Sequence, residues 1–243
     1  MEPLKISFWV SGGFVPPPYP LHLDAVLAYV ETRAALRDLN ESNSSVAALR
    51  ALAEHLPLGR HEQDGGWCWM ASALMPNGSV RNAGRFFTQR RDKEDYAARV
   101  ARQELRHGRH PIGAPMAPYQ YAIDTQRGVY RNLLGFYPVQ HGMPDANTPD
   151  HLLLEAWCVG HRARIESLLQ DGWLTHLGAR RRSGHGRIER ISVARDETAL
   201  EMWKQRVRPW PMLPEDVAIQ AAAQPPYWAA ELRGRAYCPT TLA

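Results

Sequence analysis

Alternation of apolar and polar side chains predicts a strand at the start of the chain. In "LKISFWV", Ile6, Phe8 and Val10 alternate with Lys5 and Ser7, which is the period of a half-buried strand. Glycines at 12 and 13 end the run. Two later stretches, "HLLLEAWCVG" (151–160) and "RIERISV" (187–193), are the other clear strand candidates.

Helical spacing of apolar residues predicts a long amphipathic helix over 21–39. Leu23, Val26, Leu27 and Val30 recur on one face, and Asp24 lies in the first turn. A second helix is expected from about 46 to 55, a third over the basic stretch 91–110, and a fourth over "HRARIESLLQD" (161–171).

The remaining elements are shorter. "GGWCWMASALM" (65–75) reads as a strand or hairpin arm leading to a turn at Pro76–Gly78, and 119–139 as short β pieces around a turn at Arg127–Gly128. Along the chain, the predicted order is strand–helix in the N-terminal part and strand–helix–loop–strand in the C-terminal part. This predicts an α+β fold of the ferredoxin-like (RRM-like) type in a single domain, 1–243, with a helical and basic insertion at 40–120. A tail rich in proline and tryptophan, 195–243, is expected to pack on the body.

The composition of the chain is mildly basic. The 243 residues carry a net charge of +4, and the positive charge is mostly clustered arginine. Arginine suits phosphates and stacked bases better than lysine does, but high-GC coding, which also favours arginine, is the alternative explanation. Cys68, Cys158 and Cys238 lie far apart, which is typical of buried thiols and not of a disulfide framework or zinc ribbon. Without a leader or a membrane-length apolar run, a soluble cytoplasmic protein is expected.

The strongest candidate site is the glycine–arginine segment "LGARRRSGHGRI". Glycines let backbone N–H groups turn towards a ligand, and arginines add charge-assisted bonds to phosphate oxygens. The alternative is a flexible surface loop with solvated arginines. The candidate nucleic-acid-binding residues here are Gly178, Arg180, Arg181, Arg182, Ser183, Gly184, His185, Gly186 and Arg187.

Two further patches combine arginine with aromatic residues, a mixture that suits single-stranded nucleic acid. A charge-balanced exposed helix and a plain hairpin tip are the alternatives. The first patch comprises Arg85, Phe86, Phe87, Arg90, Arg91, Arg99, Arg102 and Arg106, and the second Gln126, Arg127, Tyr130 and Arg131.

No motif predicts hydrolysis, a metal or a cofactor. His107 and His110 are three residues apart, but no carboxylate or cysteine completes a metal set. His22 and Asp24 could form an acid–base pair, yet both lie at a helix start, where capping is the expected role.

A glycine–arginine loop between the last helix and the last strand resembles the signature loop of the repeat-associated (RAMP) superfamily of CRISPR proteins. With "YPLHLDAVLAYV", "GGWCWMASAL", "IDTQRGVYR", "EAWCVG" and "PPYW" in this order, the chain resembles the Cas-five-like subunit (Csf-three) of type IV CRISPR effector complexes from about residue 4 to 238. The loop departs from the usual pattern, since Arg181, Arg182 and Ser183 precede Gly184 and His185 replaces an aromatic residue.

The resemblance implies a noncatalytic subunit that holds the 5′ handle of the CRISPR RNA and caps a filament of backbone subunits. It also implies a neighbouring large subunit and contact with target DNA near the protospacer-adjacent motif (PAM). Related RAMP subunits cleave precursor RNA without metal, so a metal-independent endoribonuclease using His22, Tyr29 or His185 is the competing hypothesis. The third hypothesis is an unrelated basic scaffold protein.

Overall fold

The computed structural model describes residues 1–17, 19–39, 46–92, 120–124, 129–143, 151–227 and 229–242. The chain divides into two compact units, one formed by Met1–Arg81 with Gln140–Ala243 and the other by Asn82–Val139. Within the described ranges, no helix is both long and apolar enough to cross a membrane.

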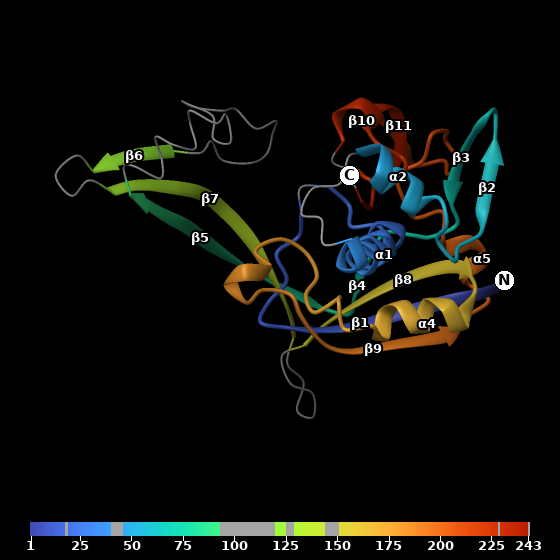
Figure 1. Ribbon diagram of the computed structural model, residues 1–243, viewed down its shortest axis with the longest axis horizontal. Helices are drawn as coiled ribbons and strands as arrows, with labels where there is room; N and C mark the ends of the chain where they lie inside the picture. Colours follow the sequence, from blue (N-terminus) through green and yellow to red (C-terminus); the bar gives the residue numbers. More distant parts are fainter. Residues whose placement is uncertain are drawn as a thin grey trace. The chain divides into compact units, whose positions relative to one another are not determined.

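The first unit is built on a four-stranded antiparallel sheet (Figure 1). The strand order is β4 (Met75–Asn77), β8 (Leu152–Gly160), β1 (Glu2–Ser11) and β9 (Arg187–Arg195). In the centre, Ile6 of β1 lies opposite Ala156 on one side and Val193 on the other. The strands predicted at the start of the chain, at 151–160 and at 187–193 are therefore confirmed.

One face of this sheet carries the main core. Buried β1 side chains, Leu4, Ile6 and Phe8 among them, pack with Leu27 of α1 (Leu23–Leu39) and Ile165 of α4 (Arg162–Gln170). Both helices therefore cover the same face, because alternate residues of a strand point to one side. The helices predicted over 21–39 and 161–171 are confirmed, as is α2 (Val46–Ala53).

The turn predicted at Pro76–Gly78 is wrong in its first part, because Met75–Asn77 forms β4. Within the described sheet β4 pairs with β8 alone, so it is an edge strand, where proline is tolerated despite its missing N–H. Gly78 follows with a φ of 90°, and there the chain leaves the strand.

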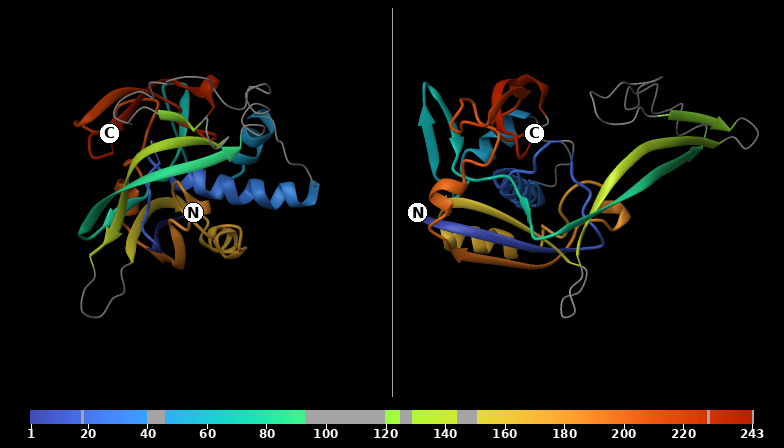
Figure 2. Two further views of the ribbon diagram at one scale, coloured as in Figure 1. Left: turned by 90° about the vertical axis from the view of Figure 1, so that its left-hand side faces the viewer. Right: turned by 180° about the vertical axis from the view of Figure 1, so that it is seen from behind.

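Smaller elements complete the unit. β2 (Arg60–Gln63) and β3 (Gly66–Trp69) form a hairpin, and β10 (Asp216–Ala221) pairs with β11 (Gly234–Pro239). The start of β1 lies beside α5 (Ala199–Met202), as Figures 1 and 2 show. Buried Trp203 and Trp210 pack with Cys68, and short 3-10 helices occur at η1 (Arg181–Ser183) and η2 (Ala230–Leu232).

The second unit contains most of a three-stranded sheet in the order β5 (Val80–Asp92), β7 (Val129–Gly142), β6 (Gln120–Asp124). β6 and β7 are antiparallel, with Asp124 opposite Val129, so the β pieces predicted around residues 127–128 are confirmed and their turn lies outside the described residues. Of the helix predicted over 91–110, the first two residues belong to β5 and the rest lie outside the described residues.

Candidate nucleic-acid interface

The glycine–arginine loop joins α4 to β9 and is pinned to the segment that follows β1. Main-chain hydrogen bonds run from the Ala179 N–H to the Val15 carbonyl and from the Gly186 N–H to the Gly13 carbonyl, both at 2.8 Å. A third bond of 2.8 Å, from the Leu177 N–H to the Gly186 carbonyl, closes the loop on itself. The loop thus has a defined backbone conformation.

The glycines of the loop allow this close backbone approach. Gly178 and Gly186 have φ values of 80° and 74°, and a Cβ on Gly186 would lie 1.9 Å from the Leu177 carbonyl oxygen. On the facing segment, a Cβ on Gly12 would lie 2.6 Å from the carbonyl oxygen of Gly184. No side chain fits at such distances, so glycine is required for packing as well as for φ.

The expectation that glycine N–H groups of the loop face a ligand is wrong for two of them. The Gly184 N–H donates to the Arg181 carbonyl at 3.0 Å, and the Gly186 N–H donates to Gly13. The fold itself therefore takes up these two donors.

Arginine side chains form the exposed side of the loop. Arg181, Arg182 and Ser183 make up η1 and are exposed, as is Gly184, whereas Arg180 is half-buried with a φ of 58°. Within the described residues, neither Arg181 nor Arg182 forms an ion pair with a carboxylate. Exposed Arg187 lies 3.5 Å from a carboxylate oxygen of Glu189.

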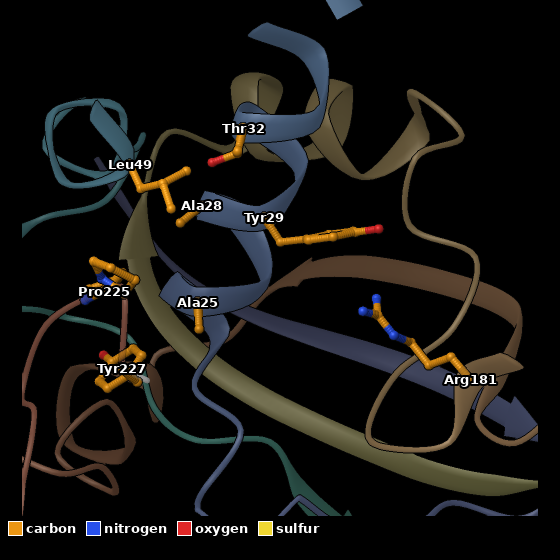
Figure 3. Close-up of a pocket in the computed structure, with 9 residues that line it drawn as sticks. Ala25, Ala28, Tyr29, Thr32, Leu49, Arg181, Pro225 and Tyr227 are labelled. Carbon is orange, nitrogen blue, oxygen red and sulfur yellow. The ribbon is translucent and has the colours of Figure 1, made fainter. Parts of the chain in front are cut away.

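Arg181 reaches back over α1. Its guanidinium carbon lies 5.1 Å from the centre of the Tyr29 ring, within cation–π range, and Figure 3 shows the two side chains pointing towards each other. Two cavities meet at this pair, of about 370 Å³ and about 180 Å³. The site therefore combines exposed cations with a hollow against a helix.

The histidines considered for catalysis are buried. His185 is 3% exposed, and its Nδ1 lies 2.9 Å from the Gly12 carbonyl oxygen. His22 is 1% exposed, and its Nε2 accepts the Val207 N–H at 3.0 Å. Burial, with the positive charge of Arg206 as a smaller cause, holds the pKa of His22 well below its ordinary value of 6.5, so the ring is neutral.

Asp24 neither pairs with His22 nor caps α1. Its Oδ2 accepts from Arg206 at 3.1 Å and from the Tyr227 hydroxyl at 2.7 Å, and the side chains of Asp24 and Arg206 are fully buried. Sequence reasoning missed this pair because its partners are 182 residues apart. The one local signal is that Arg206 and Arg208 flank Val207 directly before the apolar run "PWPML".

The other predicted patches lie in or near the second unit. Arg85 is an exposed residue of β5. Phe86, Phe87, Arg90 and Arg91 also belong to β5, and Tyr130 and Arg131 belong to β7, without described side chains. Arg99, Arg102, Arg106, Gln126 and Arg127 lie outside the described residues.

In the part of the chain that the structure describes, no three His, Cys, Asp or Glu side chains cluster as a metal site would need. No curated protein matches the chain. A family model described as CRISPR type IV associated protein Csf3 matches residues 2–239. This match covers nearly the whole chain and confirms the resemblance drawn from the ordered motifs. The chain belongs to the Csf3 family of type IV CRISPR-associated proteins.

Proposed function

We propose that this chain is a noncatalytic CRISPR RNA-binding subunit, which holds the 5′ handle of the guide RNA and caps the backbone filament of a type IV effector complex. The observation that carries the proposal is the pair of exposed arginines, Arg181 and Arg182, without carboxylate partners among the described residues on a loop pinned by main-chain bonds. Membership of a type IV CRISPR-associated family supports a role in a type IV effector complex.

The fold proposed for this role is the ferredoxin-like RAMP fold. The sheet supports it, because its strands occur along the chain in the order β1, β4, β8, β9, with α1 after β1 and α4 after β8. Their spatial order, β4-β8-β1-β9 with antiparallel neighbours, is the arrangement that a split β-α-β pair produces.

A rigid loop suits the recognition of a phosphate backbone. Guanidinium groups bind phosphate oxygens through charge-assisted and often bidentate hydrogen bonds. Main-chain bonds from Ala179 and Gly186 to the segment after β1 fix the backbone that carries the arginines, so less ordering entropy is lost on binding. The neighbours proposed with the RNA are the backbone and large subunits and target DNA near the PAM.

The absence of RNA cleavage is part of the proposal. A general base must come within hydrogen-bond reach of the 2′-hydroxyl. Burial of His22 and His185 speaks against that role for either ring, which leaves Tyr29 as the third candidate to test. Incubation of the purified chain with labelled repeat RNA in EDTA should give no discrete product. A single cut that disappears on substitution of one of these residues would favour the endoribonuclease.

Salt dependence of RNA binding tests the proposal directly. The double variant Arg181→Gln/Arg182→Gln should reduce the slope of log K against log salt by up to ~0.7 for each phosphate of a single strand that the arginines no longer neutralise. Arg195→Gln is the matched control, since Arg195 is also exposed but is already paired with Glu197 at 2.7 Å. An unchanged slope in the double variant would remove the loop from the interface.

A further inference from the structure

A groove runs along one side of α1 and is divided by a tyrosine–arginine pair. The larger cavity, about 370 Å³, and the smaller, about 180 Å³, share Ala25, Tyr29 and Arg181 in their walls. Tyr29 projects from the helix and Arg181 reaches over from η1, as Figure 3 shows. Tyr29 and Arg181 therefore form part of the wall of both cavities.

The described residues that line the larger cavity are mostly apolar, and none of them carries a carboxylate. Helix residues four apart form the floor, and the facing wall comes from the segment that precedes η2. Polar groups are few among the described lining residues: the Thr32 and Tyr29 hydroxyls and the Arg181 guanidinium, since the Tyr227 hydroxyl already bonds to Asp24 and Arg206. The lining residues are Ala25, Ala28, Tyr29, Thr32, Leu49, Arg181, Pro225, Pro226 and Tyr227.

This combination favours a flat, uncharged ring attached to an anion. A volume of about 370 Å³ lies at the lower end of the ~300–1,000 Å³ typical of small-molecule pockets. An aromatic side chain offers a stacking surface to any base, whatever its sequence identity. Arg181 shares the cavity with that surface, while exposed Arg182 follows it in η1, so positive charge lies next to the stacking surface.

We propose that the groove is a subsite for one unpaired nucleobase of the bound RNA, stacked against Tyr29, with Arg181 bonded to the phosphate that flanks it. The inference rests on the proposed function and adds a base-binding position to a loop proposed so far to hold the backbone. An apolar side chain of a protein partner is the competing occupant. Arg181, together with the absence of a carboxylate among the described lining residues of both cavities, favours an anionic ligand over it.

Replacement of single bases tests the subsite. The probe is the 5′ segment of the RNA that co-purifies with the chain and its complex, resynthesised with an abasic ribose at one position at a time. At one position the abasic RNA should bind the wild-type chain roughly 5- to 150-fold more weakly, the range of one base–aromatic stack. Tyr29→Ala should cause a loss of similar size with intact RNA and no further loss with that abasic RNA.

Matched variants separate stacking from damage to the fold. Tyr29→Phe keeps the ring and should retain affinity within about 2-fold, a margin well below the loss of one stack. Tyr19→Ala is the control, because Tyr19 is another tyrosine under an arginine, with Arg233 at 5.3 Å, and lines a different cavity. 2-Aminopurine at the sensitive position should be quenched by the wild-type and Tyr29→Phe chains but not by Tyr29→Ala.

Three results would overturn the inference. If Tyr29→Ala weakens every abasic RNA to the same degree, no base occupies the groove. If it leaves RNA affinity unchanged but reduces recovery of the partner subunits, the groove binds protein. In both cases the proposed function survives, provided that Arg181→Gln/Arg182→Gln still lowers the salt slope. If the wild-type chain binds no RNA, the subsite and the proposed function fail together.

Discussion

Neutralising Asp24 should destabilise the protein more than removing the hydroxyl that bonds to it. Asp24 faces the fully buried guanidinium of Arg206, whose other acceptors are the Tyr227 hydroxyl and four carbonyl oxygens, those of Trp69, Ala71, Val207 and Ala223. Burial alone would lower the pKa of Arg206, but the charge of Asp24 and its hydrogen bond, together with the influence of Tyr227 and Cys68, outweigh burial and raise the pKa above the ordinary value. The guanidinium therefore stays charged inside the protein.

The expected losses in the free energy of unfolding follow from these contacts. Asp24→Asn keeps the volume and an acceptor oxygen but leaves a buried cation uncompensated, which costs ~3–5 kcal/mol when one partner of a buried pair is removed. Tyr227→Phe keeps both charges and removes one hydroxyl, which donates to Asp24 at 2.7 Å and accepts from Arg206 at 2.6 Å. Arg206 Nη2 still donates to Asp24 and to the Ala223 carbonyl, so the loss is close to that of one hydrogen bond to a charged group, ~1.5–3 kcal/mol, and Tyr227→Phe should cost less than Asp24→Asn.

Urea unfolding followed by tryptophan fluorescence measures both values, because buried Trp69 and Trp203 belong to the same unit. With a slope of ~2 kcal/mol per molar urea, Asp24→Asn should lower the midpoint by ~1.5–2.5 M. Tyr19→Phe, at an exposed tyrosine, is the control and should leave the midpoint unchanged. A cost below ~1 kcal/mol for Asp24→Asn, or a greater cost for Tyr227→Phe, would refute the account of a desolvated ion pair.

Two further predictions concern single residues. Gly184→Ala and Gly186→Ala both impose a positive φ on alanine, which costs ~1–2 kcal/mol of unfolding free energy. Only Gly186→Ala also places a Cβ against the backbone of Leu177, so in thermal or urea unfolding it should cost a further ~1–3 kcal/mol. Equal costs for the two variants would contradict the close packing at Leu177. Because the pKa of buried His22 lies well below 6.5, the unfolded chain binds this proton first as pH falls, and stability present above pH 6.5 should decrease by up to ~2 kcal/mol by pH 5. His22→Gln should remove that part of the pH dependence, and identical profiles for variant and wild type would exclude His22 as its source.

Local pattern is enough to predict the elements that form the core. Ile6, Phe8 and Val10 alternate because β1 is half-buried between β8 and β9, and the apolar spacing of α1 reflects one face against the sheet. Such periodicities depend on the immediate neighbours in the chain. The edge position of β4 depends instead on which strand lies beside it, so the local pattern around Pro76 predicts a turn where a strand forms.

The candidate site is only half predictable for the same reason. Clustered arginine in "ARRRSGHGR" predicts a cationic surface, and η1 does expose Arg181 and Arg182. The function of the glycines depends on Gly12, Gly13 and Val15, which are more than 160 positions earlier in the chain. The groove beside Tyr29 likewise combines α1 with residues 225–227, a contact that no local spacing encodes.

Arg181 and Arg182 are neighbours in sequence, but the structure gives them different surroundings. Arg181 lies over Tyr29 and lines both cavities of the groove, whereas Arg182 lines neither. If both bind phosphate, each single Gln variant should lower the salt slope by a similar amount. Only Arg181→Gln should also change the affinity ratio between intact RNA and RNA abasic at the sensitive position. A ratio that changes equally in both variants would mean that the loop binds backbone and base as one surface, without a separate pocket at Tyr29.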